Sequence, residues 1–297
     1  MLSQPISVSF DLGGGRMVTI ETGKLARQAD GSVTVRQGNC IILATVVANK
    51  EPKEGQDFFP LIVDYTEKFA AAGRIPGSFF KREGRLSDYE VLISRLVDRS
   101  LRPLFPEDYF CDVQVLVTLV SSDAEVVPDA LACLAASAAL AVSDIPIKEI
   151  ISQARVAKIE GSLVVNPSRS ELAKADFDFL IAATEKNLMM VEGQAQEASE
   201  EELVTAMEMA HEAIRTQIKA QAELAAKKGV GAKRDYTKPA EKPELKEKVE
   251  AYRDRVYQVS RSGSNKAVRS EGYDALKKEL VESLGEEAES ADVKLVK

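Results

Sequence analysis

The sequence is poor in several residue types, and each shortage excludes a class of site. It contains one histidine, His211, and no tryptophan. A single histidine excludes every mechanism that needs two of them. The three cysteines, Cys40, Cys111 and Cys133, are far apart and form no Cys-x-x-Cys pair. A disulfide framework and a structural zinc site are therefore not expected, and this cysteine usage is typical of a reducing cytosol.

Long apolar runs and an excess of positive charge are also lacking. No stretch reaches the roughly 18 uninterrupted apolar residues of a membrane span, and the N-terminal segment has neither the basic start nor the apolar run of a signal peptide. We therefore expect no membrane partner. The chain has 39 lysine and arginine residues against 47 aspartate and glutamate residues, a net charge of −8. Any site for a polyanion must then be a local patch.

The 297 residues are enough for one large or two modest domains. β-Rich runs bounded by turn residues predict strands, and an apolar, alanine-rich run at 128–142 predicts a buried helix that can approach a sheet closely. Together they predict an α+β domain over residues 1–198, with mixed β-sheets and packed helices. Its strands are expected at 17–21, 32–37, 40–47, 57–66 and 113–121, and its hairpins at 154–166 and 177–192.

The pattern becomes helical from residue 199 onward. Ser199 precedes three glutamates in an arrangement like a capping box, and apolar residues then recur every three or four positions until Gly229. After a linker at 229–243, two further amphipathic helices are expected at 244–258 and 268–284. Residues 199–297 are therefore predicted to form a small all-α domain.

Basic residues are concentrated between positions 68 and 102. This segment has eight basic and four acidic residues, so its net charge is +4 within a chain of −8. Most of the bases are arginines, which suit forked contacts with phosphate. The composition therefore indicates an anionic ligand, with RNA as one such ligand. The basic residues are Lys68, Arg74, Lys81, Arg82, Arg85, Arg95, Arg99 and Arg102.

A Gly/Pro-rich loop at 73–84 displays Phe79, Phe80, Lys81 and Arg82. Aromatic rings on which bases stack, beside cations that hold the backbone, are the ingredients of a site for single-stranded nucleic acid. The alternative is that the two phenylalanines anchor the loop in the core, which is the commoner role of such a pair. The residues alone leave both interpretations open.

A helix is predicted after the capping box at 87–90. It places Arg95, Arg99 and Arg102 at i, i+4 and i+7, on one face, where they could bind an anion. Equally, these arginines could pair with Asp98 and other acids in a structural network. The sequence does not decide between the two.

Several long motifs resemble the bacterial polynucleotide phosphorylase family. The likeness extends over essentially the whole chain and implies a first RNase PH-like core, related to ribosomal protein S5 domain 2, over 1–198, followed by the all-helical domain at 199–297. The motifs are GRIPGSFFKREGR at 73–85, ISRLVDRSLRPLFP at 93–106, VPDALACLAASAALAVSDIP at 127–146 and LMMVEGQA at 188–195.

The resemblance implies a cytoplasmic, phosphorolytic 3′→5′ exoribonuclease, or polyribonucleotide nucleotidyltransferase, of mRNA degradation. Such enzymes are ring-shaped homotrimers in which a loop of the first core grips single-stranded RNA. That loop corresponds here to Phe79, Phe80, Lys81 and Arg82, with Arg85 as the next RNA-binding candidate. Lys81 stands where the family has arginine, so a point charge replaces a fork.

In this family catalysis resides in a second core, and the chain is expected to end before it. Where the first core would carry the phosphate loop, residues 121–129 read SSDAEVVPD, and the carboxylates of Asp123 and Glu125 would repel phosphate. Where the family's carboxylate pattern would stand, the residues are Leu172, Asp178 and Leu180. We therefore expect no catalytic residue and no metal ligand in this part, and Mg²⁺ only in the full-length enzyme.

Three functions follow from these observations. The leading one is an RNA-binding part of a polynucleotide phosphorylase that supports ring assembly and is inactive alone. A second is a non-enzymatic assembly module in which the arginine row is structural. A third is a single-core phosphorolytic RNase, which would need an intact phosphate loop and carboxylate pair.

Overall fold

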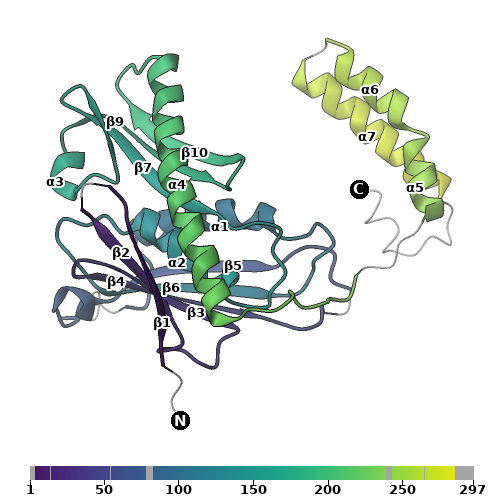
Figure 1. Ribbon diagram of the computed structural model, residues 1–297. Coiled ribbons are helices and arrows are strands. Elements are labelled where there is room, and N and C mark those ends of the chain that lie inside the picture. The colour runs from purple at the N-terminus through teal and green to yellow at the C-terminus, as the bar shows by residue number, and fades with distance from the viewer. Residues whose placement is uncertain are drawn as a thin grey trace. The chain divides into compact units, whose positions relative to one another are not determined.

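The computed structural model describes residues 4–13, 15–53, 55–77, 83–238, 243–263 and 265–284. The chain divides into two compact units, Met1–Thr237 and Lys238–Lys297 (Figure 1).

The first unit contains a six-stranded sheet with the strand order β1-β2-β3-β4-β6-β5. Its neighbours are antiparallel except for β5 and β6, which are parallel. A parallel pair needs a long crossover, and here the crossover contains helix α1 (Asp88–Leu101). The strands are β1 (Ile6–Asp11), β2 (Met17–Thr22), β3 (Gly31–Gln37), β4 (Cys40–Ala48), β5 (Leu61–Glu67) and β6 (Val113–Ser121).

A second, four-stranded antiparallel sheet follows, with the order β10-β9-β7-β8. The hairpin between β7 and β8 turns at Glu160 and Gly161, whose φ angles are 50° and 80°. Tight two-residue hairpins of this kind need a positive φ at both central residues. Both predicted hairpins are confirmed, as are the five predicted strands; β1 and the short helix α3 (Arg169–Leu172) were not predicted. The strands are β7 (Ser152–Ile159), β8 (Ser162–Val165), β9 (Ala175–Ala183) and β10 (Leu188–Ala195).

Helix α2 (Asp129–Ala141) lies between the two sheets, and every one of its residues is buried. It packs on β3 and β4 on one side and on β7 on the other. Its small side chains allow the backbone to come very close to the six-stranded sheet. A Cβ added at Gly31 would lie 2.1 Å from the carbonyl oxygen of Ala139. The predicted buried helix is therefore confirmed, and the glycine in β3 is its counterpart.

Helix α4 (Glu200–Lys228) belongs to this first unit, whereas the sequence placed it in a separate all-α domain beginning at 199. Its apolar stripe, Ala206, Ala210, Ile214 and Ile218, is buried in one cluster with side chains of β7 and β9. The structure divides after Thr237 instead, because the stripe that predicted an amphipathic helix is covered by the sheet.

The segment after α4 is fastened to the C-terminal end of α2. Gly229 ends α4 in a left-handed conformation, as expected. Lys228 Nζ then donates to the carbonyl oxygen of Val142 at 2.8 Å, and Lys233 Nζ to those of Leu140 and Ser143 at 3.0 and 2.7 Å. Burial lowers the pKa of Lys233 to about 8. These ammonium groups satisfy carbonyls at a helix C-terminus, which bears partial negative charge.

The second unit is helical, with α5 (Pro243–Glu250), α6 (Arg253–Arg261) and α7 (Lys266–Ser283). The single helix predicted at 244–258 is thus two helices. Both terminal nitrogens of Arg255 in α6 donate hydrogen bonds to the Glu279 carboxylate of α7, each at 2.7 Å. None of the helices that the structure describes has the length and apolar character needed to cross a bilayer.

The contact between β3 and α2 gives a first prediction. Gly31→Ala should lower the free energy of unfolding by about 2 kcal/mol, because backbone must move to admit the new methyl group. Gly231→Ala is the matched control, since a Cβ there meets no atom within 4 Å. Urea unfolding of both variants measures the effect. Equal stabilities for the two variants would show that the sheet and helix are not in tight contact.

Candidate nucleic-acid interface

The loop expected to grip RNA lies partly outside the described residues. Phe79, Phe80, Lys81 and Arg82 fall there, so the structure describes only the two ends of the loop. At one end a 3-10 helix, η1 (Phe69–Ala72), is closed by Gly73 in a left-handed conformation with φ of 66°. The amide of the following residue, Arg74, donates to the carbonyl oxygen of Phe69 at 2.9 Å. The first end of the loop therefore has a fixed backbone path.

Glu83 joins the two ends. Its carboxylate accepts a hydrogen bond from the amide of Phe69 at 2.8 Å and lies 3.3 Å from Lys68 Nζ. The backbone hydrogen bond from Phe69, assisted by Lys68, lowers the pKa of Glu83 despite some burial. The carboxylate is thus held in its charged form by groups of the chain itself.

Glu90 fixes the second end of the loop. Ser87 and Glu90 form the predicted capping box, which is confirmed at the start of α1. The Glu90 carboxylate accepts from the amides of Glu67 and Ser87, each at 2.7 Å. Burial works to raise the pKa of Glu90, but these backbone hydrogen bonds outweigh it, so the pKa is lowered. The start of α1 is therefore tied to the end of β5.

Two arginines beside these carboxylates stay open to ligands. Arg74 and Arg85 are exposed, and neither side chain makes a hydrogen bond or an ion pair with another described residue. They line a groove of about 460 Å³ at the base of the loop, together with Lys68 and Phe69. We call it the loop-base groove. Its other lining residues are Thr66, Glu67, Ala72, Glu83, Leu86, Ser87 and Glu90.

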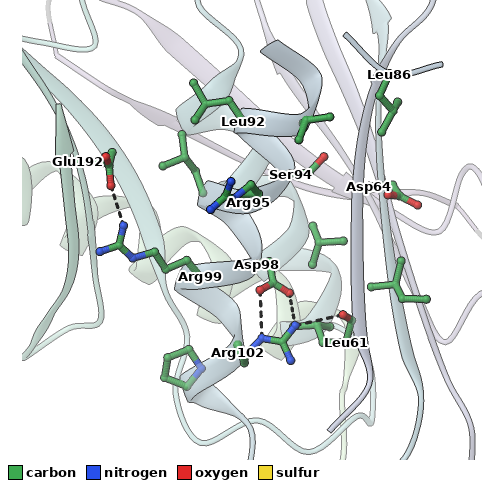
Figure 2. A pocket seen from close by; sticks show the side chains of 15 residues that line it. Leu61, Asp64, Leu86, Leu92, Ser94, Arg95, Asp98, Arg99, Arg102 and Glu192 are labelled. Carbon is green, nitrogen blue, oxygen red and sulfur yellow. Dashed lines mark hydrogen bonds and ion pairs between the residues drawn. The ribbon is translucent and has the colours of Figure 1, made fainter. Parts of the chain in front are cut away.

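The arginine row of α1 lies in a second and larger groove, of about 910 Å³, between α1, β5 and β10 (Figure 2). Arg99 pairs with Glu192 of β10 at 2.7 Å. Arg102 forms two hydrogen bonds with Asp98, at 2.6 and 3.0 Å, and donates to the carbonyl oxygen of Leu61 at 3.2 Å. Arg95 alone of the three has no such partner among the described residues.

The row is therefore divided. Arg99 and Arg102 make the structural network that was one of the two interpretations, while Arg95 keeps a guanidinium available to an anion. Sequence spacing placed all three on one face but could not show this difference, because Glu192 is far away in the chain.

The place of the family's carboxylate pattern contains an ion pair that the sequence did not predict. Arg155 of β7 bridges Asp129 of α2 and Asp178 of β9, and all three side chains are at most 15% exposed. Burial by itself would favour loss of the proton, but the two carboxylates outweigh it and raise the pKa of Arg155 above its ordinary value. One guanidinium of the chain therefore pairs with both carboxylates, and the three side chains together carry a formal charge of −1.

The segment at the place of the phosphate loop is likewise occupied by the chain. The Glu125 carboxylate accepts from the amide and the hydroxyl of Ser170, at 3.2 and 2.6 Å. Asp123 accepts from the amide of Asn39 at 3.3 Å. The adjoining cavity, between Arg155 and Glu125, is small, about 30 Å³. Phosphate would meet two carboxylates there.

These residues do not fit a divalent cation. Asp178 is engaged by Arg155, and Leu180 beside it on β9 has no ligand atom and is buried. Across the described ranges, no group of three or more His, Cys, Asp or Glu side chains is arranged to hold a metal. The described residues at this place therefore offer no catalytic step through a metal.

Comparison with known proteins connects this geometry to a family. Models of the 3′ exoribonuclease family match residues 14–146 as domain 1 and residues 149–213 as domain 2. The polyribonucleotide nucleotidyltransferase of Cytophaga hutchinsonii is 52% identical over 281 residues, covering 94% of this chain and 39% of that protein. The enzyme of the same name from Bacteroides fragilis is 53% identical over 285 residues, covering 95% and 40%. The chain thus spans about two fifths of these relatives.

One solved structure shares the fold. The Archaeoglobus fulgidus exosome with RNA bound to the active site matches with a TM-score of 0.54 and 16% identity, over 71% of this chain and 85% of that chain. The α+β architecture expected from the motifs, a core of the RNase PH type, is confirmed.

The division within the arginine row can be tested by stability. Arg102→Gln should lower the free energy of unfolding by about 1–2 kcal/mol, since it removes charge-assisted hydrogen bonds to Asp98 and to backbone carbonyls. Arg95→Gln, on the same helix face, should change it by less than about 0.5 kcal/mol. Chemical denaturation of both variants is the measurement, and a reversed order would contradict the structural role of Arg102.

Proposed function

Because the chain belongs to the 3′ exoribonuclease family, we propose that it is part of a phosphorolytic 3′→5′ exoribonuclease, a polyribonucleotide nucleotidyltransferase of RNA degradation. In this proposal the chain itself handles single-stranded RNA and supports assembly, and the chemistry belongs to a second core. The observation that carries it is the contrast between two places: a loop base with open guanidinia, and a centre whose two carboxylates are both paired with Arg155.

The charges of the loop base support the RNA role. Arg74 and Arg85 are exposed, while the carboxylates of Glu83 and Glu90 are occupied by backbone amides. Guanidinia without partners are suited to phosphodiester oxygens. Phe79, Phe80, Lys81 and Arg82 would add stacking rings and cations from the same loop.

The proposal includes properties of the whole enzyme. It would be a cytoplasmic homotrimer in the shape of a ring, and it would use Mg²⁺ in the second core. The first core is not suited to that ion, because Asp178 already pairs with a buried arginine. A single-core phosphorolytic RNase is disfavoured for the same reason.

The alternative is an assembly module without a role in RNA binding. The ion pairs of Arg99 with Glu192 and of Arg102 with Asp98 favour it in part, since they make most of the arginine row structural. Substitutions in the loop distinguish this alternative from the RNA-binding proposal, whereas substitutions in the arginine row do not.

The RNA role predicts a loss of affinity when the loop cations are removed. The variant with Lys81, Arg82 and Arg85 changed to alanine should bind oligo(A) at least tenfold more weakly at moderate salt. The slope of log K against log[salt] should fall by about 2 units, because each phosphate that a cation neutralises adds about 0.7 to that slope. Fluorescence anisotropy at several salt concentrations measures both quantities.

The matched control removes three exposed lysines elsewhere, Lys24, Lys50 and Lys219. It changes the net charge equally, so it should retain most of the affinity. If loop and control variants bind alike, the loop has no specific RNA role and the assembly module is favoured.

The occupied centre predicts that the 297-residue chain has no phosphorolytic activity alone. Incubation with poly(A), inorganic phosphate and Mg²⁺ should release no nucleoside diphosphate above background, while a full-length polyribonucleotide nucleotidyltransferase in the same assay does. Release by the isolated chain that is lost in Asp178→Asn would refute the proposal that this core is inactive.

A further inference from the structure

We propose that the loop-base groove binds one nucleotide of the RNA strand, with its phosphate on Arg74 and Arg85 and its base against Phe69. This inference rests on the proposed function and extends it, since neither Arg74 nor Phe69 belongs to the loop motif of Phe79, Phe80, Lys81 and Arg82. The groove is formed entirely by described residues and has a volume of about 460 Å³, within the range of small-molecule sites.

The position of Arg74 is set by the backbone that precedes it. The amide of Gly73 donates to the carbonyl oxygen of Ala70 at 3.0 Å, and that of Arg74 to the carbonyl oxygen of Phe69 at 2.9 Å. The carbonyl oxygen of Ala71 accepts from the amide of Ser122, at the end of β6, at 2.9 Å. The turn that carries Phe69 and Arg74 is therefore anchored to the sheet, which reduces the entropy lost on binding.

The acids of the groove leave the arginines to a ligand. The lining residues include three acids, Glu67, Glu83 and Glu90, so the formal charges balance Lys68, Arg74 and Arg85. Each carboxylate, however, already accepts a hydrogen bond within the chain.

The donors to these carboxylates are known. Glu67 accepts from the hydroxyl of Tyr65 at 2.8 Å, and Glu83 and Glu90 accept from backbone amides. Lys68 is directed to Glu83 at 3.3 Å. Among the charged side chains that line the groove, those of Arg74 and Arg85 make no hydrogen bond or ion pair with a described residue, and guanidinia, which are donors only, match phosphate oxygens.

Phe69 gives the groove its second property. It is half-buried, and it is the one aromatic residue among those that line the groove. An aromatic ring beside cations accepts bases of any sequence by stacking. The groove should therefore hold a nucleotide more tightly than it holds inorganic phosphate, and this separates it from a simple anion site.

The test uses the whole chain and a fluorescent oligo(A) of about 12 nucleotides, a length suited to single-strand sites. Arg74→Gln should weaken binding by about fivefold or more and reduce the salt slope by about 0.7. Phe69→Leu should weaken binding by about fivefold or more with no change in the salt slope, because stacking involves no phosphate charge. Lys50→Gln, an exposed cation outside the groove, is the control and should bind like the unaltered chain.

A competition measurement separates nucleotide from phosphate. Adenosine monophosphate should displace the oligonucleotide at concentrations where inorganic phosphate does not, and Phe69→Leu should abolish that difference. Circular dichroism and thermal unfolding establish that each variant is folded, and Phe69→Tyr, which keeps the ring, should restore affinity.

The outcomes distinguish this inference from the proposed function. If a variant with only Lys81 and Arg82 changed to alanine loses RNA affinity while Arg74→Gln and Phe69→Leu bind normally, the groove is not a nucleotide site and the RNA role stands. Equal displacement by phosphate and by adenosine monophosphate overturns the role of Phe69. If the unaltered chain binds no RNA at all, the proposed RNA role and this inference both fail.

Discussion

The free edge of β5 is the constraint on which the proposed RNA-binding surface depends. On its other side β5 pairs with β6, and the outward backbone groups need partners. Helix α1 supplies them with side chains: Ser94 accepts from the amide of Tyr65 at 2.8 Å, and Glu90 from that of Glu67 at 2.7 Å. Arg102 donates to the carbonyl oxygen of Leu61 at 3.2 Å. A helix thus takes the place of a seventh strand, and its position follows from these bonds.

Because α1 is fixed in this way, the basic residues of 68–102 fall into two groups: those that hold the fold together and those that stay open to a ligand. A guanidinium that satisfies a strand carbonyl, as that of Arg102 does, is held in one geometry and is less available to a ligand. Among the described residues, the cations left open are Arg74 and Arg85, before the helix, together with Arg95. The net charge of +4 in the segment therefore overstates the charge open to a ligand, because Arg99 and Arg102 are paired. The turn before Arg74 and the helix cap after Arg85 set where these two arginines lie at the loop base.

The local elements were predictable because each is encoded by neighbouring residues. Ser87 with Glu90, and Ser199 with Glu202, define helix starts within one turn, and Gly229 ends a helix by its backbone freedom. Long-range pairing was not predictable. The apolar stripe of α4 shows that the helix has a face to bury, but it does not show that a sheet covers that face. The domain boundary was therefore placed too early, at 199. Likewise, nothing near Arg155 in the sequence indicates two carboxylates from other elements.

The ion pairs of Arg155 show what rigidity a core of this fold can gain at the place of the family's carboxylate pattern. A catalytic centre must keep carboxylates and a phosphate site open to solvent and substrate. Here the Arg155 guanidinium pairs with both carboxylates, and the Glu125 carboxylate accepts from the amide and the hydroxyl of Ser170. Because Arg155 lies on β7 and its partners on α2 and β9, the pair ties the central helix to the four-stranded sheet. Removing the Arg155 side chain would leave two largely buried carboxylates without a counter-ion, at a cost of about 3–5 kcal/mol. In the proposed function, the absence of chemistry in this core and its rigidity are therefore two results of the same residues.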